Sequence, residues 1–165
     1  MTPGYDQPEL CRIVTLDDMN AVMAEVLNAG GSVTFSPKGI SMQPLLIQKR
    51  DHVTISKPKG RIKLYDVLFY RRENGMFVLH RVVGKNKNGY ILCGDNQRVK
   101  EYGITDANVI AVMTAFKRKG RDYTTRSFAY RLYSFFWTLI LPVRHPVLRL
   151  YERIKAKFTK KRNKW

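Results

Sequence analysis

The sequence FVLHRVVGKNKNGYILC, residues 77–93, has the pattern of two strands joined by a turn. Both ends are rich in β-branched and aromatic residues, and Gly, Lys and Asn fill the middle, residues 84–88. This pattern is typical of a β-hairpin. Because successive side chains of a strand point to opposite faces, we expect Val78, His80 and Val82 to share one face.

The same texture extends outward from this hairpin over residues 32–116, with Gly, Pro, Asn and Lys clusters between short apolar runs. No helical periodicity interrupts these runs, which indicates a mostly β, antiparallel domain. The six expected strands are Val33–Phe35, His52–Ser56, Asp66–Tyr70, Phe77–Val83, Gly89–Cys93 and Val109–Phe116.

Helical patterns flank this β region. Apolar residues recur at helical spacing within residues 15–29, and the pattern is helical again from about residue 126. We therefore expect three parts: an N-terminal segment with a short helix (1–31), a β domain (32–119), and a basic, partly apolar helical tail (120–165).

The tail carries most of the positive charge. The chain has a formal net charge of +17, and residues 117–165 hold 15 of its 30 Lys and Arg but only two acidic residues. That segment is therefore +13, and residues 1–116 are only +4. Such a tail suits an anionic lipid surface or a nucleic acid.

An apolar run of 12 residues, Leu132–Val143, lies inside this basic tail. A helix needs about 20 such residues to span a bilayer, so residues 126–165 are expected to attach the protein to an anionic membrane surface. The alternative is a helix packed on the β domain. Nucleic acid is a less fitting partner, because an apolar run is a poor lining for a nucleic-acid groove.

The N-terminus has no apolar run of the length that a secretory signal needs. We therefore expect membrane association from the cytoplasmic side, with a soluble cytoplasmic protein as the alternative.

Cys11 and Cys93 form no disulfide framework and match no metal-ligand spacing. No metal and no cofactor are expected.

Three short stretches could carry chemistry. In Gly39-Ile40-Ser41-Met42-Gln43-Pro44, a serine lies on a constrained loop where backbone N–H groups can converge on an oxyanion. A serine in such a loop is otherwise a turn residue. His80, on its strand, has a side chain suited to proton abstraction near neutrality, although a histidine between valines is commonly structural. Asp95, in Cys93-Gly94-Asp95-Asn96, could orient the His80 ring or could belong to a turn.

Taken in order, these stretches resemble the type I signal peptidases. The residues that carry the resemblance are Ser41-Met42-Gln43-Pro44, Tyr65-Asp66-Val67-Leu68, His80-Arg81-Val82-Val83 and Gly94-Asp95-Asn96. The match covers about residues 32–116. It implies the antiparallel β fold that signal peptidases share with the LexA-type self-cleaving repressors.

The resemblance implies a serine endopeptidase that cleaves a peptide or precursor protein. Ser41 would be the nucleophile and His80 the general base, as in the endoplasmic-reticulum and archaeal branch of the family. Asp95 would be the acid that orients His80, with Glu101 as a possible second acid. The position of Gly39 implies an oxyanion hole built from backbone N–H groups. The family also implies a small residue before the cleaved bond.

Two features depart from the family. Its members have an N-terminal transmembrane anchor, and the sequence shows none, which argues against cleavage of secretory precursors. Most bacterial members and the LexA-type repressors use a Lys base where this chain has His80. Two alternatives therefore remain: an inactive homologue that binds peptides or membranes, and a nucleic-acid-binding protein that uses the basic tail.

Overall fold

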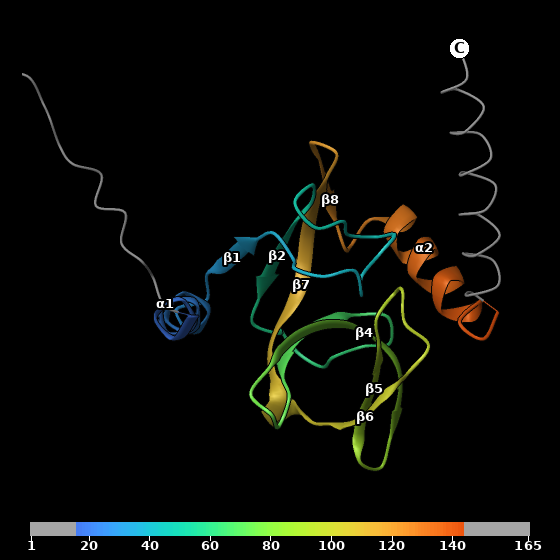
Figure 1. The fold of residues 1–165 in the computed structure, drawn as a ribbon, viewed down its shortest axis with the longest axis horizontal. Helices are drawn as coiled ribbons and strands as arrows, with labels where there is room; N and C mark the ends of the chain where they lie inside the picture. The colour runs from blue at the N-terminus through green and yellow to red at the C-terminus, as the bar shows by residue number, and fades with distance from the viewer. Residues whose placement is uncertain (1–15, 144–165) are drawn as a thin grey trace, which may run out of the picture.

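Residues 16–143 are the part of the chain that the structure, a computed structural model, describes. They form one antiparallel β sheet with a helix before it and a helix after it (Figure 1). The prediction of a mostly β, antiparallel fold is therefore confirmed. The predictions for Cys11 and for the basic residues 144–165 lie outside the described residues.

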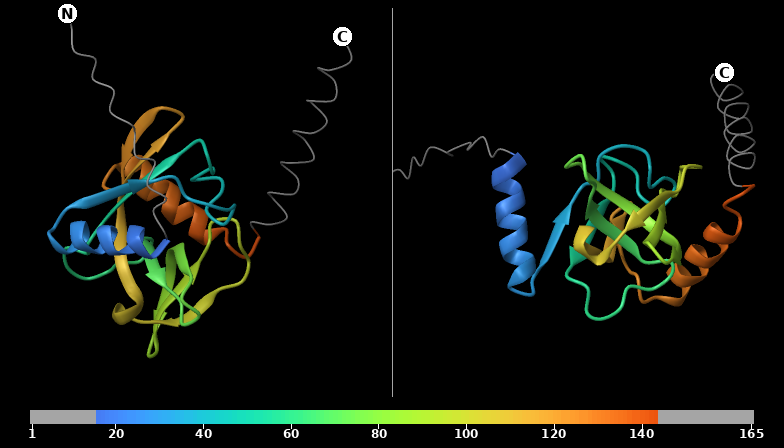
Figure 2. Two further views of the ribbon diagram at one scale, coloured as in Figure 1. Left: turned by 60° about the vertical axis from the view of Figure 1, so that its left-hand side comes forward. Right: turned by 90° about the horizontal axis from the view of Figure 1, so that it is seen from below.

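The sheet has eight strands in the order β1-β2-β7-β3-β4-β5-β6, and β8 pairs with β7. The strands are β1 (Ser32–Phe35), β2 (His52–Ser56), β3 (Val67–Arg71), β4 (Phe77–Asn86), β5 (Gly89–Cys93), β6 (Glu101–Ile104), β7 (Val109–Arg118) and β8 (Arg121–Thr124). A short 3₁₀ helix, η1 (Asp106–Asn108), leads into β7. The sheet is strongly curved rather than flat (Figure 2).

All six expected strands are present, with ends shifted by a few residues, and the expected hairpin is the β4–β5 pair. Two strands were not expected. One is β6, and the other is β8, which continues the sheet beyond residue 119. The short helix expected over residues 15–29 is α1 (Leu16–Asn28), at the β1 end of the sheet.

The β3–β4 register divides the core into two clusters. His80 pairs with Leu68 and Arg81 pairs with Val67, and paired residues of an antiparallel ladder share a face. The His80 face belongs to a cluster that contains Leu68, Tyr70, Val82, Tyr90, Leu92 and Ile104, with Val78 packed against it. The Arg81 face belongs to a larger cluster that includes Met42, Val67, Phe69, Leu79 and Tyr130. The expected common face of Val78, His80 and Val82 is confirmed.

The second helix, α2 (Phe128–Leu139), lies at the other end of the molecule from α1 (Figure 1). Its N-cap is Ser127, whose hydroxyl accepts a hydrogen bond from the amide of Tyr130. The helix ends before Pro142, a residue that cannot continue it. Among residues 16–143, no helix is long and apolar enough to cross a membrane.

Candidate active site

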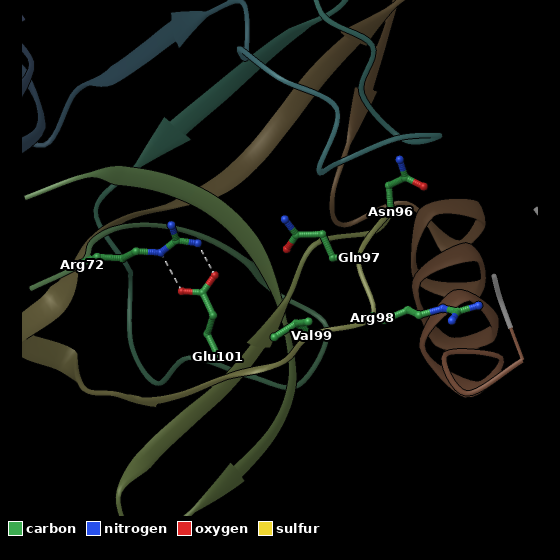
Figure 3. A pocket seen from close by; sticks show the side chains of 6 residues that line it. All are labelled: Arg72, Asn96, Gln97, Arg98, Val99 and Glu101. Atoms are coloured by element: carbon green, nitrogen blue, oxygen red, sulfur yellow. Dashed lines mark hydrogen bonds and ion pairs between the residues drawn. The ribbon is translucent and has the colours of Figure 1, made fainter. Parts of the chain in front are cut away.

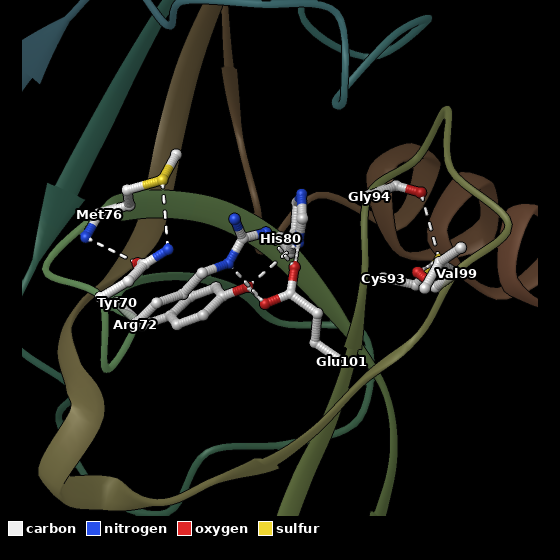
Figure 4. Close-up of polar contacts among 9 residues, drawn as sticks. Tyr70, Arg72, Met76, His80, Cys93, Gly94, Val99 and Glu101 are labelled. Atoms are coloured by element: carbon white, nitrogen blue, oxygen red, sulfur yellow. Dashed lines mark hydrogen bonds and ion pairs between the residues drawn. The ribbon is translucent and has the colours of Figure 1, made fainter.

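His80 lies at the centre of a buried polar group. Its side chain is 1% exposed, and its Nδ1 is 3.0 Å from Oε1 of Glu101 and 3.2 Å from the hydroxyl of Tyr70 (Figure 4). A carboxylate can only accept, so we assign the Nδ1 proton to the bond with Glu101. The imidazole then presents Nε2 as its unprotonated nitrogen, which is the form that a general base requires.

Glu101 is itself held on both carboxylate oxygens. Tyr70 donates its hydroxyl proton to Oε2 over 2.7 Å. Arg72 donates from Nε to Oε2 over 2.9 Å and from its second guanidinium nitrogen to Oε1. A bidentate arginine fixes the orientation of a carboxylate as well as its charge, so Glu101 is fixed in place against His80.

These contacts set the protonation states. Burial raises the pKa of Glu101, but the hydrogen bonds from Arg72 and Tyr70 outweigh burial and bring that pKa below its ordinary value. Burial lowers the pKa of His80 and outweighs the opposing effect of Glu101. At neutral pH the group is therefore a carboxylate beside a neutral imidazole.

Asp95 does not contact His80. Its carboxylate forms a bidentate pair with Arg81, in which Nε donates to Oδ1 over 2.8 Å and Nη2 donates to Oδ2 over 2.7 Å. Both side chains are 1% exposed. The expectation that Asp95 orients His80 is therefore corrected: Glu101, the second-ranked acid, makes that contact.

The physical reason lies in strand β4. His80 and Arg81 are adjacent, so their side chains point to opposite faces of the sheet. Asp95 follows β5 and reaches the face that holds Arg81. Glu101 opens β6, where it pairs with Leu92 of β5, and Leu92 belongs to the same cluster face as His80. Glu101 therefore contacts His80 on one face of the sheet, and Asp95 contacts Arg81 on the other.

The loop that carries Ser41 is anchored on both sides of the serine. Met42 is buried in the larger core cluster, and the carbonyl of Ser41 accepts a hydrogen bond from the amide of Asn96 over 2.7 Å. Gly94 packs so closely under this carbonyl that a Cβ there would lie 2.8 Å from the Ser41 oxygen. The Ser41 loop and the Gly94–Asn96 turn therefore fit together because residue 94 has no side chain.

The sheet register brings His80 to the same turn. Arg81 pairs with Cys93, and continuing this register by one residue places His80 opposite Gly94, which contacts Ser41. Within residues 16–143 no hydrogen bond joins the Ser41 hydroxyl to His80. Such bonds are commonly long in unliganded enzymes and shorten when substrate binds.

The expected oxyanion donors divide into used and unused groups. The amide of Gly39 donates to the side chain of Gln48 over 3.0 Å, so it is occupied. In the described part of the chain, no hydrogen bond is donated by the amides of Ile40, Ser41 and Met42. These three amides are therefore available as hydrogen-bond donors, and Gly39 contributes the turn, with φ +83°. Pro44, three residues after Ser41, is partly buried in the same loop.

A cleft of about 580 Å³ opens beside Glu101 (Figure 3). Its lining residues are Arg72, Asn96, Gln97, Arg98, Val99 and Glu101. Three of them belong to the site already described: Glu101 contacts His80, Arg72 holds Glu101, and Asn96 holds the Ser41 carbonyl. The cleft therefore adjoins Glu101 and the Asn96 turn, and neither Ser41 nor His80 is among its lining residues.

Tyr70 and Arg72 were not identified from the sequence. The available signal was their spacing, because two polar side chains two residues apart at the end of an apolar strand share one face. That signal does not say which residue lies opposite. The pairing with Glu101 depends on the position of β6, which the sequence pattern did not indicate.

No protein-family model matches the sequence, and searches of curated proteins and of solved structures found no match. A function for this chain therefore rests on the residues of the site.

Proposed function

We propose that the chain is a serine endopeptidase of the signal peptidase/LexA-like fold class, in which Ser41 is the nucleophile and His80 the general base. Glu101 replaces Asp95 as the acid that orients His80. The observation that carries the proposal is the 3.0 Å contact between His80 Nδ1 and Glu101 Oε1 inside a buried network. A base oriented in this way by a carboxylate is the arrangement of a Ser-His-acid triad.

In the proposed reaction, Nε2 of His80 takes the Ser41 hydroxyl proton as the oxygen attacks a peptide carbonyl. Glu101 stabilises the imidazolium that forms, and the Ser41 amide donates to the tetrahedral oxyanion. The C–N bond then breaks, and His80 returns its proton to the leaving amine. Water, deprotonated in turn by His80, hydrolyses the acyl-enzyme and restores Ser41.

The substrate class is a peptide or a precursor protein, bound in an extended form beside the sheet by backbone hydrogen bonds. In this proposal the cleft next to Glu101, which Asn96, Gln97, Arg98 and Val99 line, receives the substrate on one side of the cleaved bond. The charge of Arg72 is paired with Glu101, and the Arg98 side chain is directed toward α2 (Figure 3).

A serine-reactive phosphonate probe tests the proposal. We expect the probe to label the full chain on Ser41, found by mass spectrometry, and to fail on Ser41→Ala. His80→Ala should reduce the labelling rate by at least about a hundredfold, the usual contribution of a general base. Ser32→Ala, which removes an exposed hydroxyl on β1, is the matched control and should label at the wild-type rate. Labelling of Ser41→Ala at the wild-type rate would rule out Ser41 as the nucleophile.

A second candidate is an inactive homologue that binds peptides, and one observation favours it: Ser41 and His80 share no hydrogen bond in the described structure. In that case the probe would label neither the wild-type chain nor any variant, yet extended peptides would still bind. Peptide binding measured on the same preparations separates the two functions.

A further inference from the structure

The inner face of α2 is bound to the body of the protein by polar contacts. Arg81 donates to the hydroxyls of Tyr130, over 3.2 Å, and Ser134, over 2.8 Å. Trp137 donates from Nε1 to the carbonyl of Asp95 over 3.0 Å. These helix residues lie three or four positions apart, as one face of a helix requires. α2 is therefore attached to the turn that also holds the Ser41 loop.

The outer face of α2 is apolar and exposed. Its side chains recur at helical spacing, and the largest exposures are 78% for Phe128 and 62% for Leu139. The residues of this outer face are Phe128, Leu132, Phe135, Phe136, Leu139 and, just after the helix, Val143. An exposed apolar patch of this kind marks an interaction surface.

The charge around this patch selects the kind of partner. From residue 123 to residue 151 the sequence has no acidic residue, and residues 144–165 contain nine Lys and Arg with Glu152 as their one acid. An apolar helix face that is followed in the sequence by a strongly basic segment is complementary to a bilayer with anionic headgroups, which attracts basic residues and accepts apolar side chains. It does not suit a nucleic acid, because the exposed side chains of the face are phenyl and aliphatic groups.

We propose that the outer face of α2 docks on an anionic lipid bilayer, with the helix lying in the plane of the surface. The inner face keeps its contacts with Arg81 and Asp95, so the bilayer-bound helix holds the Ser41–His80 site at a fixed position near the membrane. The predicted membrane attachment of residues 126–165 thereby has a defined contact surface. This proposal does not require peptidase activity, because docking uses none of Ser41, His80 and Glu101.

The test is sedimentation of the full chain with vesicles of phosphatidylcholine alone or with 30% phosphatidylglycerol, about a third of the lipid. We expect binding to the anionic vesicles, weaker binding at high salt because screening shortens the reach of the charges, and little binding to the neutral ones. Leu132→Glu with Phe136→Glu should weaken binding at least about tenfold, since two apolar side chains leave the bilayer. Val22→Glu, at a 59% exposed position on α1, is the matched control and should bind as wild type.

Thermal unfolding of each variant shows whether it is folded. Leu139→Glu, on the same face of α2, is a second variant that should weaken vesicle binding. The proposal is overturned if the full chain does not sediment with anionic vesicles. It is also overturned if the folded double variant binds as well as wild type, because the basic tail alone would then be sufficient. A wild-type dimer that the double variant loses would assign the face to a second copy of the chain, and retention on DNA without vesicle binding would assign the charge to nucleic acid.

Discussion

Replacing Asp95 with alanine tests whether this residue has a structural role, as opposed to the catalytic role proposed for Glu101. The substitution leaves the Arg81 guanidinium buried, with its Nε and Nη2 donors no longer paired to a carboxylate. Three acceptors remain to Arg81 through Nη1, namely the Tyr65 carbonyl and the hydroxyls of Tyr130 and Ser134. None of them carries a negative charge, so the arginine becomes an uncompensated buried cation.

The magnitude follows from the burial of both partners, each 1% exposed. Breaking a buried ion pair by removing one partner costs about 3–5 kcal/mol, which is a large share of the roughly 5–15 kcal/mol that stabilises an ordinary domain. A pair replaced on both sides avoids this cost, because no charge stays buried alone. We therefore expect Asp95→Ala to lower the free energy of unfolding by about 3–5 kcal/mol, and Arg81→Met with Asp95→Leu to lower it by less.

Urea unfolding followed by circular dichroism measures both variants against wild type, with Asp122→Ala as an exposed control. A loss below about 1 kcal/mol for Asp95→Ala, the range of a surface ion pair, would refute the account of the Arg81 site. If Asp95→Ala is fully folded but is no longer labelled by the probe, Asp95 has a catalytic role after all.

Three further outcomes are expected. Glu101→Gln should lower the peptidase rate by about a thousandfold or more, as removal of an orienting carboxylate does, with the chain still folded by circular dichroism. A pH–rate profile should show activity falling on acidification with a midpoint below about 6.5, the ordinary histidine value, because the folded pKa of His80 is lowered. Because the folded pKa of His80 is lowered, its contribution to the free energy of unfolding is fully present above about pH 6.5, the ordinary histidine value, and is lost as the pH falls below that value. A midpoint above that value would contradict the burial argument. Gly94→Ala should cost about 1–3 kcal/mol by overpacking, since its Cβ meets the Ser41 carbonyl at 2.8 Å. Gly84→Ala should cost less in the same urea assay, because the nearest atom to a Cβ at residue 84 is Cδ1 of the Ile91 side chain, at 3.3 Å.

The local sequence pattern was sufficient to predict most strands of the sheet. The β4–β5 hairpin was predictable because apolar residues fill both strands and Gly, Lys and Asn fill the turn. Strand β6 was not, because Glu101-Tyr102-Gly103-Ile104 is short and its central two residues are exposed. It is held as an edge strand by tertiary pairing with β5.

The dependence on tertiary pairing also explains why the sequence favoured Asp95 over Glu101 as the acid that orients His80. Asp95 adjoins the hairpin in sequence, so proximity along the chain favoured it over Glu101. Which acid reaches His80 depends on the face of the sheet to which each strand end is directed. That face is set by register and by the position of β6, which are tertiary properties. Ser41 and His80 could be proposed as nucleophile and base because the motifs that contain them are local.

The adjacency of His80 and Arg81 has a consequence for how the chain can vary in length. Inserting one residue in β4 before His80 would turn the imidazole toward Asp95 and the guanidinium toward Glu101, so the proposed base and the buried cation would exchange faces in one step. The chain already accommodates an extra residue on the far side of this pair, at the bulge between Val82 and Gly84. Length changes should therefore accumulate in the turn at Lys87 and Asn88, while the segment from β3 to Val82 keeps a fixed count.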